Sequence, residues 1–88
     1  MKTPIEELRE LFKVNNTEYQ KDLAAVQQDA YALQYVKEQT PEICLAAVKR
    51  SAYALQYVKE QTPEICLAAV QRDAYALKYI SDDIKGLL

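Results

Sequence analysis

Apolar residues gather along the chain in short clusters, and the spacing within each cluster is that of a helix. Over 41–50 they fall on one broad arc of a helical wheel, which consists of Ile43, Cys44, Leu45, Ala47 and Val48. Over 52–59 a second face consists of Ala54, Leu55 and Val58, flanked by Tyr53 and Tyr57. One continuous helix over 42–60 would place apolar residues all round its axis, and no run has the alternation of a strand. The pattern therefore predicts two short helices with a turn near 49–51.

Residues at the boundaries of these segments agree with that division. Thr40-Pro41-Glu42 and Thr62-Pro63-Glu64 each read as a helix start, with Thr as the N-cap, Pro in the first helical position and an acid in the first turn. Ser51 is expected to be the N-cap of the second short helix, as Asp29 and Asp73 are in the equivalent positions.

The same pattern recurs every 22 residues. The segment 30–48 is repeated without change at 52–70, and a third copy follows over 63–80. We divide the chain into repeats at 19–40, 41–62 and 63–84, an N-terminal cap helix over 1–18 and a tail over 85–88, all within a single domain. The predicted fold class is all-α, with tandem 22-residue helix-turn-helix repeats forming a small α-solenoid or compact helical stack.

Composition argues against several classes of function. The 88 residues have a formal net charge of −2, no His and one Gly. Without His, and with cysteines on an apolar arc, neither a nucleophile–base pair nor a tetrahedral metal site can be assembled from recognisable motifs. A glycine-rich phosphate loop is likewise excluded. We therefore predict no enzyme activity, no catalytic residues, no metal and no cofactor, with Cys44 and Cys66 as reduced, buried small residues.

The beginning of the chain lacks a signal-peptide pattern, and no apolar run is long enough to span a membrane. A cytoplasmic location is expected, in the host cell if a virus or mobile element encodes the chain. Exchangeable apolipoproteins also use 22-residue units punctuated by Pro, but their units present one continuous lipid-binding face, which this chain lacks.

The first two repeats read LAAV, then a polar turn, then AYALQYV, and a new helix start follows at Thr-Pro-Glu. This pattern resembles a repeat family of unknown function found in bacteria and large DNA viruses. Its members carry tandem copies of LAAV(K/Q)-x-(N/D)-G-x-AL-x-Y(V/A), and the resemblance covers about residues 19–84. The family often has Asn-Gly at the turn, whereas this chain has Asp29-Ala30, Ser51-Ala52 and Asp73-Ala74. The resemblance implies a helical repeat and implies no chemistry.

The turn residues vary between copies while the framework does not, as expected of a binding surface. The tyrosines are candidates for the same binding surface, because six of the seven form i,i+4 pairs and Tyr is enriched at binding hot spots. The candidate partner-binding residues are Gln28, Asp29, Lys49, Arg50, Arg72, Asp73, Tyr31, Tyr53 and Tyr75. We predict a small non-enzymatic protein–protein interaction module whose partner the sequence does not name.

Other interpretations stay open. The chain could be an inhibitor encoded by a phage or mobile element, which blocks a host protein surface. It could instead bind nucleic acid through Lys49, Arg50 and Arg72, with Lys59 and Lys78 nearby. The negative net charge of the chain disfavours this. The tyrosines could simply pack between repeats. Homo-oligomers are a further possibility, because stacked repeats have adhesive ends unless they are capped.

Overall fold

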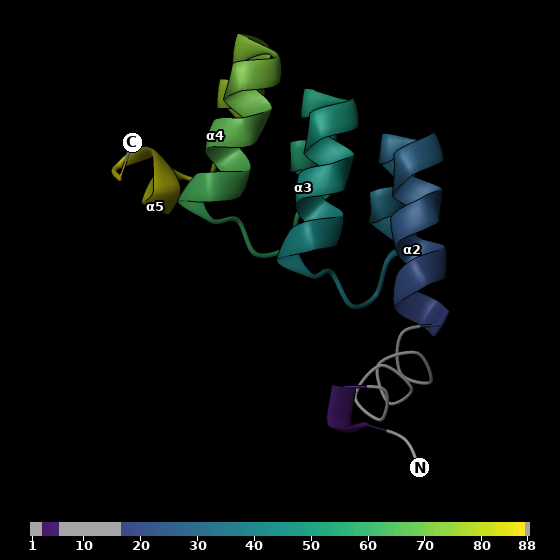
Figure 1. Cartoon of the computed structure of the whole chain (residues 1–88). Coiled ribbons are helices and arrows are strands. Elements are labelled where there is room, and N and C mark those ends of the chain that lie inside the picture. Colours follow the sequence, from purple (N-terminus) through teal and green to yellow (C-terminus); the bar gives the residue numbers. More distant parts are fainter. Residues whose placement is uncertain (1–2, 6–16, 88) are drawn as a thin grey trace.

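The structure is a computed structural model that describes residues 3–5 and 17–87, and all regular structure within these residues is helical (Figure 1). The α-helices are α2 (Thr17–Gln28), α3 (Pro41–Arg50), α4 (Pro63–Arg72) and a short α5 (Asp82–Lys85). The 3₁₀ helices are η1 (Ala30–Tyr35), η2 (Ala52–Tyr57) and η3 (Ala74–Tyr79). The all-α prediction is confirmed. The N-terminal cap helix proposed for 1–18 falls mostly on residues 6–16, which lie outside the described part.

The helices form a small stack with two layers. Helices α2, α3 and α4 stand side by side, and α3 contacts both of its neighbours (Figure 1). The 3₁₀ helices form the second layer, in which η2 contacts both η1 and η3. Because η1 also contacts α3 and η2 also contacts α4, the apolar faces of both layers enclose one core.

Local capping explains where the longer helices begin. The hydroxyl of Thr40 accepts a hydrogen bond from the Ile43 amide at 3.2 Å, and Thr62 does the same for Ile65. Pro41 occupies the first turn, where its missing amide hydrogen costs nothing. The predicted bounds of the first helix, 41–50, and its Thr N-cap are confirmed.

The second segment of each unit is a 3₁₀ helix, which the wheel analysis did not anticipate. The second unit also buries Ala54 and the third buries Ala76 and Ile80, but in the first unit the buried residues recur every third position, as Ala30, Leu33 and Val36. A 3₁₀ helix has three residues per turn, so these side chains lie on one row facing the core. The final amide bonds three residues back, from Val36 to the Leu33 carbonyl at 3.1 Å. In the first unit, the spacing of the buried residues thus agrees with the tighter helix.

The core is built from equivalent positions of successive units. Its largest fully buried side chains are Leu33, Ile43, Leu55, Ile65, Val26, Val48 and Cys66. Ala47 and Ala69 are fully buried, and their small side chains let neighbouring helices approach closely. Ala24 and Ala25 are exposed on α2. Both cysteines are buried free thiols, as predicted.

Candidate functional site

The predicted binding residues surround the sharp turns between each α-helix and the 3₁₀ helix that follows it. These turns need no glycine, because the residue between the helices is extended, with φ of −147° at Asp29 and −158° at Asp73. Each carboxylate accepts a hydrogen bond from the amide two residues on, Tyr31 at 3.0 Å and Tyr75 at 2.9 Å. The side chains that vary between copies are thus held on short, well-defined turns.

Ser51 departs from this scheme. It occupies the N-cap position of η2 with an extended backbone, φ −146° and ψ 121°, but its hydroxyl forms no capping hydrogen bond. The prediction that Ser51 caps as Asp29 and Asp73 do is therefore wrong for the side chain. The turn is retained because its backbone bonds do not need the hydroxyl: Ser51 donates to the Ala47 carbonyl at 2.9 Å and accepts from the Ala54 amide at 3.0 Å.

Two shallow grooves lie across these turns. The first, of about 420 Å³, has Arg50 and Arg72 facing Gln28, Asp29 and Tyr31. The second, of about 280 Å³, shares both arginines. We define the tip surface as the predicted residues that line these two grooves, namely Gln28, Asp29, Tyr31, Arg50, Tyr53, Arg72 and Asp73. Turns 22 residues apart in the sequence therefore contribute to one surface.

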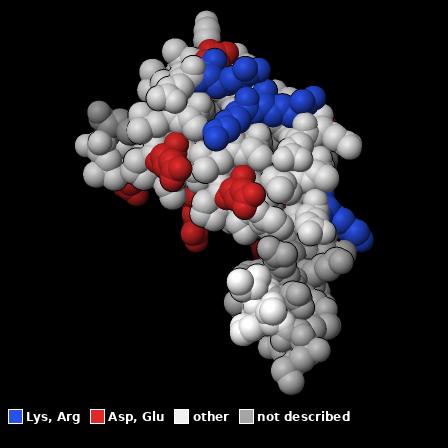
Figure 2. Space-filling model, viewed as in Figure 1, with Lys and Arg blue, Asp and Glu red and all other residues white. Residues whose placement is uncertain are grey.

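The tip surface holds two arginines and two aspartates, Arg50, Arg72, Asp29 and Asp73, so its formal charges balance. Figure 2 shows Lys and Arg side chains gathered in one patch over the ends of α3 and α4, with acidic side chains against its upper edge and others lower on the same face. Arg72 donates from Nη2 to the Arg50 carbonyl at 3.4 Å, which links neighbouring turns. Within residues 3–5 and 17–87, neither guanidinium forms an ion pair.

Tyr53 and Asp73 add a polar pair at the second groove. The negative charge of Asp73 is the main reason that the pKa of the Tyr53 phenol is raised, with smaller contributions from burial and from a hydrogen bond to the same carboxylate. The phenol is therefore protonated at neutral pH and retains its O–H donor. The groove thus presents guanidinium, phenol and carboxylate groups side by side.

Some candidate residues lie elsewhere. Lys49 lines a separate hollow along α3, together with Glu42 and Glu64. Tyr75 is 69% exposed but lines neither groove of the tip surface. Lys59, expected near the turns, lies at the opposite end of its unit, because it follows η2 rather than α3 and its ammonium approaches the Lys37 carbonyl at 3.5 Å.

The tyrosines pack between units. Tyr31 meets Tyr57 of the next unit edge-on, with ring centres 5.9 Å apart, and Tyr53 meets Tyr79 at 6.1 Å. Such contacts add to apolar burial. Tyr31 remains 41% exposed, so it packs with Tyr57 and also lines the first groove.

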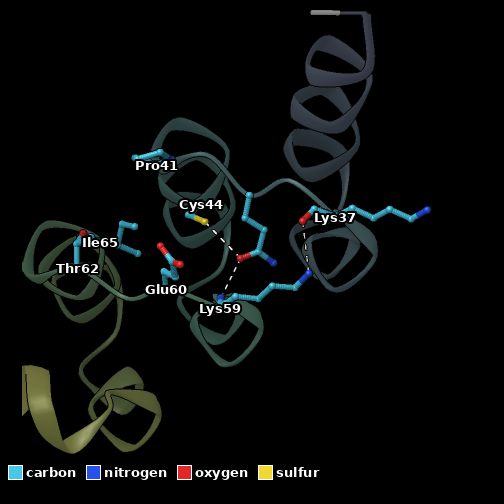
Figure 3. A pocket seen from close by; sticks show the side chains of 8 residues that line it. Lys37, Pro41, Cys44, Lys59, Glu60, Thr62 and Ile65 are labelled. Atoms are coloured by element: carbon cyan, nitrogen blue, oxygen red, sulfur yellow. Dashed lines mark hydrogen bonds between the residues drawn. The ribbon is translucent and has the colours of Figure 1, made fainter.

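A pocket of about 260 Å³ opens where α3 and α4 begin, at the opposite end of these helices from the turns (Figure 3). It lies between the connections that lead into the two helices. Gln39 organises it. Its Nε2 donates to the Tyr57 carbonyl at 2.8 Å and the Leu33 carbonyl at 3.2 Å, while its Oε1 accepts from the Lys59 amide at 2.9 Å and, weakly, from the Cys44 thiol at 3.7 Å. The side chain thereby joins two successive units.

Gln61 repeats this arrangement one unit later. It donates to the Tyr79 carbonyl and accepts from the Ser81 amide, both at 2.8 Å. Sequence reasoning missed both glutamines, although one available indication was a Gln immediately before Thr-Pro in two copies. Their bonds are made within the fold, so we assign this pocket to holding the units together.

Two further findings concern cofactors and membranes. Within the described ranges, no three His, Cys, Asp or Glu side chains are grouped so that they could hold a metal ion. No helix in that same part of the chain is both long and apolar enough to cross a membrane.

Comparison with known proteins identifies one family. The model of a domain of unknown function, DUF4116, matches residues 23–62 and again 40–85. The two matches overlap in tandem, and together they cover well over half of the chain. No curated protein and no solved structure matches the chain.

Proposed function

The chain belongs to the DUF4116 family, a domain of unknown function, and from that premise we propose that it is a non-enzymatic protein-interaction module that binds an acidic segment of a partner protein at the tip surface. The proposal names the kind of partner and the face that binds it.

One observation carries the proposal: stacking brings turn residues that differ between copies, Gln28, Arg50 and Arg72 among them, together on the tip surface. The segments 30–48 and 52–70 are identical, whereas the turns read Gln27-Gln28-Asp29, Lys49-Arg50-Ser51 and Gln71-Arg72-Asp73. Stacking brings Gln28, Arg50 and Arg72 from three successive turns to one groove. A constant framework that presents variable side chains side by side is typical of repeat proteins that bind other macromolecules.

The groups in the grooves indicate the chemistry of the partner. Arg50 and Arg72 present planar guanidinium groups without an ion pair in the described part of the chain, and a carboxylate can accept two hydrogen bonds from each. Tyr31 and Tyr53 lie next to these arginines and offer ring surface and a hydroxyl. Arg and Tyr are the residue types that most often dominate binding energy at protein interfaces. Asp29 and Asp73 line the same grooves, and each already accepts a hydrogen bond from a backbone amide. The partner we propose is therefore an Asp- or Glu-rich segment that pairs with the two arginines.

A peptide-display selection tests the proposal. The full chain is used to select peptides from a random library, and enriched peptides are measured by fluorescence anisotropy against wild type, Arg50→Glu and Arg72→Glu. We expect enrichment of Asp and Glu, and affinity reduced at least about tenfold by either reversal, because a lost charge-assisted hydrogen bond is worth about 1.5–3 kcal/mol. Lys37→Glu is the matched control, since it makes the same charge change at the opposite end of the unit.

Three results would contradict the proposal: enriched peptides without acidic residues, equal losses in Lys37→Glu and Arg50→Glu, or no enrichment. A single-stranded oligonucleotide is tested in parallel. If it binds with an affinity that falls steeply with salt and competes with the peptides, the tip surface is a nucleic-acid site instead.

A further inference from the structure

The second turn differs from the other two at the residue that joins its helices. Asp29 and Asp73 stand at this position in the first and third units, and each carboxylate accepts a hydrogen bond from the amide two residues on. Ser51 stands there in the second unit, and its hydroxyl makes no capping hydrogen bond. The position thus holds a negative charge in two turns and a neutral hydroxyl in the third.

The Ser51 side chain is within reach of a large partner. It is only partly buried, and it lines both shallow grooves that cross the turns. The hydroxyls of Thr40 and Thr62, by contrast, accept the capping hydrogen bonds of α3 and α4. The fold therefore uses those two hydroxyls and does not depend on that of Ser51.

Two guanidinium groups lie beside Ser51. Arg72 donates to the Arg50 carbonyl at 3.4 Å, and this carbonyl belongs to the peptide bond that joins Arg50 to Ser51. Both arginines line the same two grooves as Ser51. Asp29 lines one groove and Asp73 the other, and each carboxylate is already engaged by an amide. A phosphate on a serine carries a charge of about −1.5 to −2 and three acceptor oxygens, and beside arginines it gains charge-assisted hydrogen bonds.

We propose that Ser51 is a phosphorylation site and that the attached phosphate pairs with Arg50 and Arg72. Lys49-Arg50 comes directly before Ser51, and protein kinases select substrates partly by such charge patterns. The phosphoryl donor is a nucleoside triphosphate. Ser51 Oγ bonds to its γ-phosphorus while the bond from that phosphorus to the β–γ bridging oxygen breaks. The hydroxyl proton passes to a base of the kinase, and a nucleoside diphosphate leaves.

The modification would regulate the tip surface, and this consequence rests on the proposed binding of an acidic segment. The unmodified tip surface holds two arginines and two aspartates, so its formal charges balance. Phosphate on Ser51 adds about two negative charges and engages the two arginines with which the partner would pair. Phosphorylation should therefore release the acidic segment.

Treatment of the full chain with a kinase tests the first part of the proposal. The folded chain is incubated with ATP and a serine kinase that prefers basic residues before its target, and the modified residue is identified by mass spectrometry. We expect phosphate on Ser51 and none in Ser51→Ala, which should fold normally because the hydroxyl caps nothing. Ser81, the other serine of the sequence, follows Ile80 rather than a basic residue and should stay unmodified.

Phosphoserine incorporated genetically at position 51 tests the pairing with arginine. We expect unfolding at a higher urea concentration than for the unmodified chain, because the new charge-assisted hydrogen bonds exist only in the folded state. The gain should be smaller in Arg72→Ala, which removes one of the two partners.

The same preparation tests the effect on binding. Affinity for the selected acidic peptides should fall at least about a hundredfold, the product of about tenfold for each arginine. Phosphoserine at position 81 is the matched control. It adds the same charge at the opposite end of the stack, where the Ser81 amide donates to Gln61 at 2.8 Å, and it should leave peptide affinity unchanged.

Three results would overturn the proposal: a folded chain that the kinase does not modify at Ser51, a phosphate at position 51 that does not raise the urea midpoint, or a gain that Arg72→Ala leaves intact. Peptides that bind equally well with and without this phosphate would overturn the regulatory role. Failure of the proposed function looks different, because no acidic peptide then binds either form, while the phosphate on Ser51 and the urea shift are still found.

Discussion

Replacing Gln39 with Ala should destabilise the fold far more than its partly exposed position suggests. The change removes amide hydrogen bonds to Tyr57, Lys59 and Leu33, of 2.8, 2.9 and 3.2 Å. At a net value of about 1 kcal/mol for each, the expected loss is about 3 kcal/mol, without counting the weak thiol contact. A chain of this length has roughly 4–13 kcal/mol of unfolding free energy, so the loss is a large fraction of the total.

Urea unfolding followed by far-UV circular dichroism measures this loss, and Gln56→Ala provides the matched control. Gln56 donates a single exposed hydrogen bond to the Tyr53 carbonyl at 3.0 Å, so its replacement should cost less than about 0.5 kcal/mol. Gln39→Glu is a second variant of nearly the same shape. It retains the acceptors but sets a carboxylate against the two carbonyl oxygens, and it should also lose more than the control. If Gln39→Ala and Gln56→Ala unfold at the same urea concentration, Gln39 does not join the units and the reasoning fails.

Three more outcomes are expected. Ala47→Glu should lower the unfolding free energy by several kcal/mol, because Ala47 is fully buried and a charge there has no partner; a variant with the wild-type thermal midpoint would contradict this. Asp73→Ala should cost about 1 kcal/mol and Ser51→Ala close to zero, because only Asp73 makes a capping hydrogen bond; equal losses in urea unfolding would refute the distinction. Burial raises the pKa of the Cys44 and Cys66 thiols above 9.0, so the native state retains protons that the unfolded chain releases, and stability should fall as pH rises above that value; at pH 8 Ellman's reagent should label the native thiols far more slowly than the unfolded ones, and fast labelling without urea would argue against burial.

Features that depend on neighbouring residues could be predicted from the sequence. The bounds and N-cap of α3 followed from Thr40-Pro41 and from the spacing of its apolar residues, because capping bonds span only a few residues. The 3₁₀ helices were missed, although the expected apolar face of Ala54, Leu55 and Val58 is buried. The wheel had been drawn with the period of an α-helix, and in so short a segment both periods place a similar set of residues on one face.

The candidate site was predictable only in part. The turns were expected to display variable residues, and Arg50 and Arg72 do line one groove. Lys49 was expected there too, but it lies in a hollow along α3. Consecutive residues of a helix point about 100° apart, so which of two basic residues reaches the neighbouring turn depends on how the units stack. The inter-unit bonds of Gln39 were invisible for a similar reason, since its partner Tyr57 is 18 residues away.

By itself, the sequence determined the helical class, the 22-residue period and the starts of the longer helices, because periodicity and capping act within one or two turns. Tertiary structure alone decided exposure. Leu55 and Leu77 follow the same local sequence, Ala-Tyr-Ala-Leu, yet one is fully buried and the other is half exposed. The difference lies in what covers each leucine, since Leu55 has a following unit packed beside it and Leu77 has none in the described structure. Short helices are stable only when neighbours cover their apolar faces, so the neighbours of each copy determine which of its repeated side chains are buried.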